Sequence, residues 1–479
     1  MDVKELTLHG DDNIKGALQA LNKTGLGTLF IINNTNRLIG VLTDGDIRRA
    51  LLTGIGLDDS IKLVMNENFI ALPIETDNGK ILEALSSSVK IIPLIDGDDK
   101  LLDYASINKI RHISVASPLL NGNELAYVTD CIKTNWISSQ GKYVKEFEKL
   151  FMNYHAGMRC LAVSNGTVAL HLALEALQIT TGDEVLVPDF TFAASVNSII
   201  YTGATPVLVD VEPDTWNIDL NKAELLITPN TKAIIPVHLY GHPCDMDAVV
   251  AFAKKHKLLI VEDCAEALGS FYKGKPVGVF GDAATFSFYG NKTITTGEGG
   301  MIIFKDEEVA ERAAMLRDHG MQKTRRYWHQ EIGYNYRLTN IQAAIGVAQF
   351  ERLEEFVSAK RRIAKTYNET LSKISFFQTP VERPDVINSY WLYTFMVNPS
   401  APFTRDELIN YLSLQRIETR PVFFPMHHMP PYVSFGQPEN LKVSKQISEC
   451  GMSLPSSVNL TELELVHICN QINVFLKEY

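Results

Sequence analysis

The sequence predicts an α/β protein whose larger part contains a mostly parallel sheet, preceded by a smaller α+β region. Three observations support this prediction. Short apolar runs alternate with helical segments over much of the chain, a weak repeat occupies residues 1–115, and a long amphipathic segment begins at residue 350. Because 479 residues exceed what one compact core usually holds, we expect two or three domains.

The region 1–115 contains an approximate repeat. Its first copy, GTLFIINNTNRLIGVLTDGDIRRALLTG, is typical of strand, turn, strand and helix, with the turn at NNTN. The second copy is weaker and runs from NGKILEALSS through KIIPLI to LLDYA. The segment IRHISVASPLLNGNE, where Ser-Pro and Gly-Asn interrupt the pattern, separates this region from the rest.

This repeat resembles a pair of CBS modules, whose nucleotide signature is Thr or Ser followed three residues later by Asp. Here the pair is Thr43 and Asp46, whose hydroxyl and carboxylate would suit phosphate and ribose hydroxyls. The alternative is structural: Thr43 caps a helix and Asp46 strengthens its N-terminus. The sequence leaves open whether region 1–115 binds a nucleotide, regulates activity or mediates assembly.

Charge and cysteine usage exclude several classes of protein. The net charge of −11 argues against non-specific binding to nucleic acid or to an anionic membrane. The six cysteines show no C-x-x-C spacing, so we expect free thiols in a reducing compartment rather than a zinc ribbon or redox motif. The N-terminus lacks the apolar region of a signal peptide, and no apolar run approaches the ~20 residues that span a bilayer. We therefore expect a cytoplasmic protein.

The segment 116–355 alternates strands and helices. Helical segments intervene between the strand runs, which predicts a mainly parallel sheet covered on both faces. Functional sites in such sheets lie beyond the C-terminal ends of the strands. After residue 355 strand runs become sparse, and a long amphipathic helix is expected to lead into a smaller domain, 356–479. The predicted strand runs are CLAVS, EVLVP, TPVLVD, KAIIPV, LLIVED and ATFSF.

The first two strand ends offer groups for an anion and for a flat ring. CLAVS is followed by Gly166 and Thr167 at the start of a strong helix, where free amides and a hydroxyl could hold a phosphate. The alternative is that Ser164 or Thr167 is a simple N-cap. Phe192, just after EVLVP, could stack on a flat ring or pack in the core.

The later strand ends carry a carboxylate and a lysine. Asp263 ends LLIVED, where a buried carboxylate is costly unless it is paired, for example with a protonated heterocyclic nitrogen. We expect its neighbour Glu262 to be more solvated, and Glu266 lies one turn further on. Ser287 ends the next strand, and Lys292 follows in a glycine-rich loop that admits a flat group close by. Asp263 and Lys292 are 29 residues apart (292 − 263), which allows one helix-and-strand crossover between them.

These groups together fit pyridoxal 5′-phosphate (PLP). The cofactor needs a lysine amine that bonds to its aldehyde, a carboxylate that keeps its ring nitrogen protonated, an aromatic ring over it and a phosphate site. The protonated ring then acts as an electron sink. All four kinds of group occur here at the ends of predicted strands.

Over residues 115–479 the chain resembles the DegT/DnrJ/EryC1/StrS family of sugar aminotransferases. The resemblance implies the type I PLP-dependent aminotransferase fold, with a large domain at 116–355 and a small one at 356–479. So many motifs in the family's order make the resemblance specific. The matching motifs are GNELAYVTDCIKTNWISSQGKYVKEFE, SNGTVALHLAL, PDFTFAAS, PVHLYGHPCDMDA, VEDCAEALGS, FSFYGNKTITTGEGGM, LRDHGM, YNYRLTNIQAAIG and RPVFFPMHHMPPY.

The resemblance assigns roles to these residues. Lys292 would be the Schiff-base lysine and proton shuttle, and Asp263 would pair with the ring nitrogen. The position near the ring hydroxyl falls at Glu266, where many members carry Gln or His. Phe192 keeps the ring-stacking role that its place suggests. The residues that would hold the phosphate are Gly166, Thr167 and Ser287.

The resemblance also implies partners and a substrate side. Asn335 would reach the phosphate of a partner subunit's cofactor, so we expect a homodimer with shared sites. Trp136, Arg420 and His427 are the candidates for binding the nucleotide sugar. The forked side chain of Arg420 suits a diphosphate, although a surface salt bridge is its alternative. The histidine spacings do not support a metal site.

The resemblance finally implies a reaction. Relatives that dehydrate carry histidine in place of the lysine, so Lys292 favours amination with glutamate as donor. The TTGEGG sequence after it favours C4 of a nucleotide-linked 4-keto-6-deoxy sugar, with GDP-4-keto-6-deoxy-mannose expected first and a UDP-linked sugar as the alternative. A regulatory or binding protein with a degenerate enzyme domain is a further alternative, against which the retained lysine, carboxylate and glycine loop argue.

Overall fold

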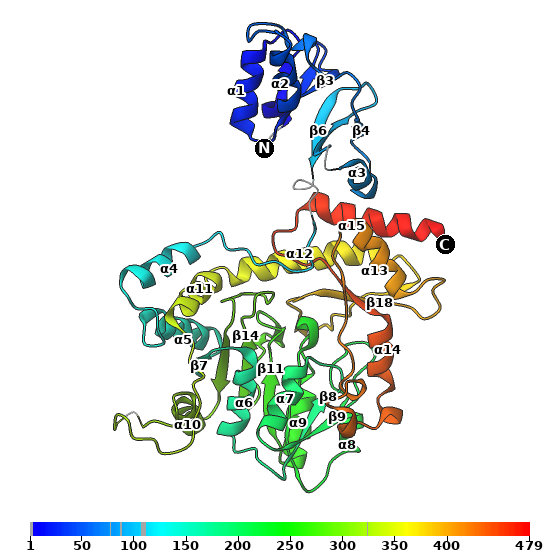
Figure 1. Cartoon of the computed structure of the whole chain (residues 1–479). Helices are drawn as coiled ribbons and strands as arrows, with labels where there is room; N and C mark the ends of the chain where they lie inside the picture. Colours follow the sequence, from blue (N-terminus) through cyan, green and yellow to red (C-terminus); the bar gives the residue numbers. More distant parts are fainter. Residues whose placement is uncertain (1–2, 77, 87–88, 107–111, 323) are drawn as a thin grey trace. The chain divides into compact units, whose positions relative to one another are not determined.

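The computed structural model describes all residues except 1–2, 77, 87–88, 107–111 and 323 (Figure 1). It divides into two compact units. The first contains residues 1–112 together with 413–416, and the second contains 113–412 and 417–479. The division into three domains, with boundaries at 115 and 355, stays a prediction. No helix in the described part of the chain is long and apolar enough to cross a membrane.

The two copies of the N-terminal repeat have the same strand pattern. In each, the first strand pairs parallel with the second and the second pairs antiparallel with the third. Both antiparallel pairs also shift register at the last residue of the middle strand. The weak sequence repeat is therefore a structural repeat. Its elements are β1 (Thr7–His9), α1 (Ile14–Thr24), β2 (Thr28–Ile32), β3 (Leu38–Thr43), α2 (Asp44–Leu52), β4 (Leu72–Pro73), α3 (Asn78–Ala84), β5 (Ile91–Ile95) and β6 (Leu101–Ser106).

Helix α2 begins with a capping box made by Thr43 and Asp46. The Thr43 hydroxyl accepts a hydrogen bond from the Asp46 amide at 3.2 Å, and the Asp46 carboxylate accepts one from the Thr43 amide at 2.9 Å. Asp46 also forms an ion pair with Arg49. Helix capping thus explains the positions of both side chains. Their nucleotide-binding role stays a prediction.

The second unit is built on a seven-stranded sheet, which is mostly parallel as predicted. The strand order is β7-β15-β14-β11-β10-β8-β9, and only β15 runs antiparallel to its neighbours. All six predicted strand runs form strands of this sheet, whereas β15 was not among them. The strands are β7 (Arg159–Val163), β8 (Glu184–Pro188), β9 (Thr205–Val209), β10 (Thr231–Ile234), β11 (Leu259–Asp263), β14 (Ala283–Ser287) and β15 (Gly300–Phe304).

Helices cover the sheet and connect its strands (Figure 1). Helix α6 is buried continuously from Ala169 to Leu174, which explains why its sequence is mostly apolar. The helices of this part are α4 (Glu124–Lys133), α5 (Lys142–Tyr154), α6 (Gly166–Ala176), α7 (Ala193–Tyr201), α8 (Leu220–Glu224), α9 (Met246–His256), α10 (Glu307–Arg317) and α11 (Asn340–Phe350). A small separate sheet contains β12 (Phe271–Tyr272), β13 (Lys275–Pro276) and β17 (Val386–Ile387).

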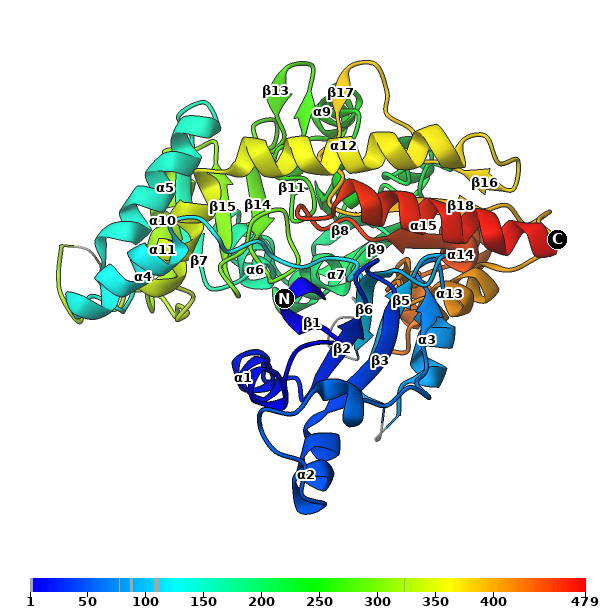
Figure 2. The ribbon, with the colours of Figure 1, turned by 90° about the horizontal axis from the view of Figure 1, so that it is seen from above.

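Helix α12 (Leu353–Leu371) is the long amphipathic helix that the sequence predicts. It buries Phe356, Ile363, Tyr367 and Leu371 at helical spacing, and it lies beside α15 (Figures 1 and 2). It leads into a four-stranded antiparallel sheet in the order β16-β18-β20-β19. The elements after α12 are β16 (Phe377–Gln378), β18 (Tyr393–Val397), α13 (Arg405–Leu414), β19 (Arg420–Pro421), α14 (Lys442–Cys450), β20 (Gly451–Leu454) and α15 (Glu462–Phe475).

Candidate active site

A cavity of about 670 Å³ lies at the C-terminal edge of the parallel strands. Gly300 of β15 pairs with both Val163 and Ser287, so the ends of β7 and β14 meet on either side of it. The structure brings all seven residues predicted to bind the cofactor within this chain to the wall of the cavity. They are Gly166, Thr167, Phe192, Asp263, Glu266, Ser287 and Lys292.

One end of the cavity is suited to a phosphate. Asn165, rather than Ser164 or Thr167, caps helix α6, because its side chain accepts a hydrogen bond from an amide three residues on. The amides of Gly166 and Thr167 lie in the first turn and have no acceptor within the helix. A Cβ atom on Gly166 would lie 2.8 Å from the Cβ atom of Ser287. The missing side chain therefore lets helix amides and hydroxyls converge on one small anion site.

Asp263, at the wall of the same cavity, is held in place by hydrogen bonds. It is 4% exposed, and its Oδ2 atom accepts a hydrogen bond from the Ser195 hydroxyl at 2.8 Å. Its Oδ1 atom accepts one from the Ala265 amide at 3.1 Å. Because each carboxylate oxygen has a second lone pair, Asp263 can also accept a hydrogen bond from a protonated ring nitrogen.

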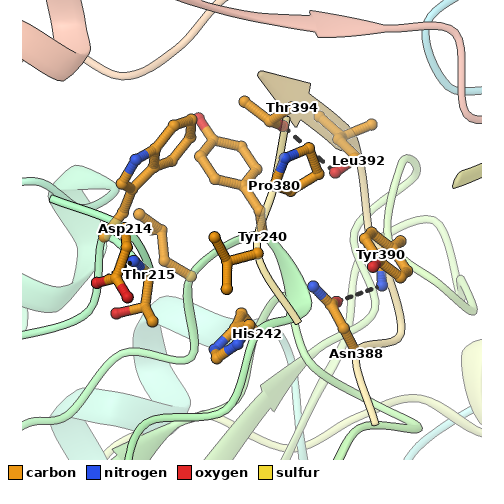
Figure 3. Close-up of a pocket in the computed structure, with 12 residues that line it drawn as sticks. Asp214, Thr215, Tyr240, His242, Pro380, Asn388, Tyr390, Leu392 and Thr394 are labelled. Carbon is orange, nitrogen blue, oxygen red and sulfur yellow. Dashed lines mark hydrogen bonds between the residues drawn. The ribbon is translucent and has the colours of Figure 1, made fainter. Parts of the chain in front are cut away.

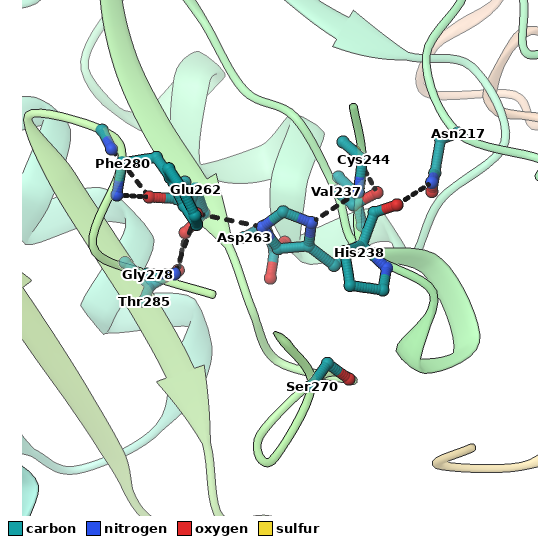
Figure 4. A network of polar contacts seen from close by, with 12 residues as sticks. Asn217, Val237, His238, Cys244, Glu262, Asp263, Ser270, Gly278, Phe280 and Thr285 are labelled. Atoms are coloured by element: carbon teal, nitrogen blue, oxygen red, sulfur yellow. Dashed lines mark hydrogen bonds and ion pairs between the residues drawn. The ribbon is translucent and has the colours of Figure 1, made fainter. Parts of the chain in front are cut away.

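Glu262 is fully buried, so the expectation that it is solvated is wrong. Successive strand residues point to opposite faces of the sheet, and Glu262 points away from Asp263. Its carboxylate accepts hydrogen bonds from the amides of Gly278, Phe280 and Gly281 at 2.7–2.8 Å and lies 3.1 Å from His238 Nε2 (Figure 4). These four donors satisfy the carboxylate in place of water, so Glu262 can be buried.

His238, Glu262 and Cys264 place potential metal-ligating atoms within 4.8 Å of one another. The amide of Cys244 donates to His238 Nδ1 at 3.0 Å, so Nε2 carries the proton and faces Glu262 (Figure 4). Burial raises the pKa of Cys264 well above its ordinary value and keeps this side chain a thiol. Hydrogen bonding thus accounts for the histidine and carboxylate atoms, and the group connects β11 to its neighbouring loops.

The amine of Lys292 lies between a carboxyl group and an indole ring. Its Nζ atom is 3.7 Å from Glu266 Oε1 and 3.6 Å from the centroid of the Trp391 ring. The other oxygen of Glu266 accepts a hydrogen bond from the Tyr240 amide at 2.8 Å. Burial raises the pKa of Glu266 to about 7, and it lowers the pKa of Lys292. Both shifts favour the neutral forms and bring the two pKa values closer together, which favours proton exchange between the carboxyl group and the amine.

Aromatic rings line the remaining wall. Phe192 is 58% exposed and lines the cavity, and its ring centroid lies 5.9 Å from that of Phe423. Tyr240 stacks between Phe423 at 5.4 Å and Trp391 at 5.9 Å, with interplanar angles of 15° and 12°. The rings of Tyr240, Phe423 and Trp391 were not predicted from the sequence. Tyr240 and Phe423 lie in the matched motifs PVHLYGHPCDMDA and RPVFFPMHHMPPY, and this membership is the sequence feature that could have identified them as site residues.

A second cavity, of about 30 Å³, shares Tyr240 and Leu392 with the large one (Figure 3). Three of its lining residues adopt positive φ angles, with 62° at Trp216, 50° at Tyr240 and 49° at Tyr390. Such backbone strain in residues other than glycine is concentrated at functional sites. Burial lowers the pKa of His242 to about 4, so this lining side chain is neutral at physiological pH.

The three substrate-side candidates occupy different environments. Arg420 lines the large cavity and also forms an ion pair with Glu418 at 2.9 Å. Trp136 is 54% exposed and is not among the residues that line the cavity. His427 is buried, and its Nδ1 atom and amide both bind Asp189, at 2.7 and 3.0 Å. The structure therefore brings only Arg420 to the cavity, and the substrate-binding roles of the other two stay predictions.

Asn335 also lies outside the cavity of its own chain. Its side-chain oxygen accepts hydrogen bonds from Arg337 at 3.0 and 3.2 Å. Arg337 in turn lines another cavity of about 610 Å³, together with Arg317 and Arg326. The role predicted for Asn335 requires a second chain.

The geometry agrees with comparisons to known proteins. A sequence model of the DegT/DnrJ/EryC1/StrS aminotransferase family matches residues 118–473, and a CBS domain model matches residues 1–53. The chain is 48% identical to GDP-perosamine synthase of Caulobacter vibrioides, over 75% of this chain and 97% of that protein. It is 47% identical to GDP-perosamine synthase of Escherichia coli O157:H7, over 77% of this chain and 100% of that protein.

A solved structure shares both the fold and the cofactor. The PLP form of Spr1654 from Streptococcus pneumoniae, described as a sugar aminotransferase, superposes with a TM-score of 0.73 at 29% identity, over 77% of this chain and 99% of that one. The anion site, the buried carboxylate and the partly buried lysine fit the same cofactor. The chain therefore belongs to the DegT/DnrJ/EryC1/StrS aminotransferase family and is a PLP-dependent aminotransferase preceded by a CBS domain.

Proposed function

We propose that this enzyme transfers an amino group from glutamate to C4 of GDP-4-keto-6-deoxy-mannose, giving GDP-perosamine. The observation that carries the proposal is the likeness to two GDP-perosamine synthases over nearly their whole length. The product would serve surface polysaccharide synthesis such as that of O-antigen, with the reaction in the cytoplasm. The same chemistry on a UDP-linked 4-keto-6-deoxy sugar is the alternative.

In this proposal, different residues of the cavity hold different parts of PLP. The amides and hydroxyls at the start of α6 and the end of β14 would hold its phosphate, and they are provided by Gly166, Thr167 and Ser287, which line the cavity. Asp263 would accept a hydrogen bond from the ring nitrogen, Glu266 would lie near the ring hydroxyl, and Phe192 would cover one ring face; all three line the cavity. When bound, the cofactor supplies an aldehyde for the amine and a ring that accepts electrons.

Lys292 then moves the proton. Its amine would take the proton from the α-carbon of glutamate and hold it for return within the same site, and it would act in the reverse direction at C4 of the sugar. Glu266, 3.7 Å from the amine, can share that proton because burial raises its pKa to about 7. The partly buried position of Lys292, 13% exposed, keeps water from competing for the proton.

The nucleotide sugar would enter through the same cavity. Arg420 presents a forked cation at the cavity wall, which suits a diphosphate. Trp136 and His427 complete the proposed substrate side. Asn335 would act from a partner subunit, so the proposed working unit is a homodimer with shared sites.

The test of the lysine assignment is Lys292→Ala. This variant should fold and lose transamination by at least about 10³-fold, because its amine carries the covalent and the proton-transfer steps. Lys305→Ala, which removes an exposed lysine just after β15, is the matched control and should keep full activity. Borohydride reduction of the wild-type enzyme should attach the cofactor to the peptide that contains residue 292. Retained activity in Lys292→Ala, or attachment elsewhere, contradicts the assignment.

The test of the substrate is a panel of GDP- and UDP-linked 4-keto-6-deoxy sugars, each supplied with glutamate. We expect 2-oxoglutarate to form at least about tenfold faster with GDP-4-keto-6-deoxy-mannose, which corresponds to a difference of about 1.4 kcal/mol in transition-state binding. Faster turnover of a UDP-linked sugar would favour the alternative and leave the lysine assignment untouched.

A further inference from the structure

Trp391 belongs to the hydrophobic core and is held from several sides, directly beside the lysine of the proposed active site. The residue lies two positions before β18 and is 5% exposed. Its indole Nε1 donates a hydrogen bond to the Asn291 carbonyl at 2.7 Å, directly before Lys292. Its own carbonyl accepts one from Lys360 of α12 at 2.9 Å. These bonds hold the ring in one place and one orientation.

The ring so fixed lies against the amine of Lys292. The Nζ atom is 3.6 Å from the ring centroid, well inside the ~6 Å over which an aromatic face attracts a cation. Trp391 also stacks on Tyr240, whose backbone amide donates a hydrogen bond to Glu266. Glu266 in turn lies 3.7 Å from the Nζ atom of Lys292. The four residues therefore form a closed cluster, here called the lysine cluster.

We propose that Trp391 is a positioning residue that holds the free amine of Lys292 beside Glu266 and favours its proton-bearing form. The inference rests on the proposed role of Lys292 as proton carrier. An amine that has taken a proton from one carbon must stay within reach until it delivers that proton to another. A fixed aromatic face attracts the ammonium without forming a strong hydrogen bond that would trap the proton.

Several charged or titratable groups bear on the same amine. Burial lowers the pKa of Lys292, and the carboxylates of Glu266 and Asp263 oppose this shift. Burial raises the pKa of Tyr240 well above its ordinary value, so this member of the lysine cluster stays neutral. Lys360 lines a small cavity with Lys292, and burial lowers its pKa to about 7. Trp391 acts alongside the two carboxylates, because its ring attracts the ammonium and not the neutral amine.

The decisive measurement is the pH dependence of Lys292 arylation in the full-length protein freed of cofactor. Reaction with dinitrofluorobenzene is followed by mass spectrometry of the peptide that carries residue 292, and the midpoint of rate against pH is compared. In Trp391→Leu the midpoint should fall by about 0.4 to 1.5 pH units. The midpoint is used because leucine also changes how easily the reagent enters.

Phe423→Leu is the matched control. Phe423 stacks on the same Tyr240 ring at 5.4 Å and lines the same cavity, but the amine of Lys292 lies over the ring of Trp391. This variant should therefore keep the wild-type midpoint. An unchanged midpoint in Trp391→Leu, or an equal fall in both variants, would overturn the proposal and leave Trp391 a packing residue.

A second arm avoids any change of shape. The chain has four tryptophans, so it can be produced with mono- and difluorinated tryptophan, which withdraws electron density from the ring face. The midpoint should fall stepwise with fluorination in the wild type and stay constant in Trp391→Phe. A flat series in the wild type also overturns the proposal. Borohydride attachment at a residue other than Lys292 would instead contradict the proposed function, whatever the midpoints.

Discussion

At the scale of single residues, the site depends on ionisable groups held where water is scarce. Asp263 has a donor for each oxygen, and Glu262 on the opposite face has four donors. Glu266 is different, because in the described part of the chain its carboxyl group accepts one hydrogen bond, from the Tyr240 amide, and lies 3.7 Å from the Lys292 amine. Its charge is thus the least compensated of the three carboxylates, and it is the one whose pKa burial raises to about 7.

This shift predicts a pH-dependent stability difference between the wild type and Glu266→Gln. The pKa of Glu266 rises from 4.5 to about 7 on folding, so the folded protein keeps a proton that the unfolded chain has lost. The resulting stabilisation is complete below pH 4.5 and disappears as pH rises to about 7. Glutamine does not titrate, so between pH 4.5 and 7.5 the variant should gain roughly 3 kcal/mol relative to the wild type.

Denaturant unfolding of both cofactor-free proteins across this pH range measures the difference. Glu354→Gln, at an exposed position of α12, is the control and should run parallel to the wild type. Parallel curves for Glu266→Gln would show that Glu266 is ionised throughout, and the proposed proton sharing with Lys292 would fail.

At the scale of elements, the site exists because strands end at the same edge and a helix starts against them. The antiparallel strand β15 pairs with both β7 and β14, and it sets the ends of these strands side by side. The start of α6 then lies against the end of β14 at a distance that only a glycine permits. The proposed phosphate site is thus a property of two elements and of the gap between them.

Gly166→Ala tests this gap. The added Cβ atom would lie 2.8 Å from Ser287 Cβ, so helix and strand must separate at some cost, about 1–3 kcal/mol for overpacking. We expect weaker PLP binding, by at least about tenfold, in absorbance titrations of the cofactor-free protein. Gly290→Ala, in the loop after β14, meets no atom within 4 Å and should bind PLP normally. Equal affinities for the two variants would place the phosphate elsewhere.

At the scale of the whole molecule, the proposed site needs a second chain, because Asn335 lies outside its own cavity. We expect a particle of twice the chain mass of 53.5 kDa in light scattering. Lys292→Ala and Asn335→Ala should each lack activity. When they are mixed and allowed to exchange subunits, each mixed dimer has one intact shared site, so about a quarter of wild-type activity should return. No recovery despite exchange would mean that Asn335 serves its own chain.

The sequence by itself determined six of the seven strands of the large sheet, the long helix α12 and the residues at the strand ends, because apolar periodicity and the turn residues between elements encode these. The sequence also identified the family, because the matching motifs and their order can be recognised without a structure. Tertiary structure alone decided that Glu262 is buried, that His427 binds Asp189 away from the cavity, and that Trp391 lies over Lys292. These facts depend on contacts between residues distant in the chain, and no local pattern specifies which distant side chain fills a given space.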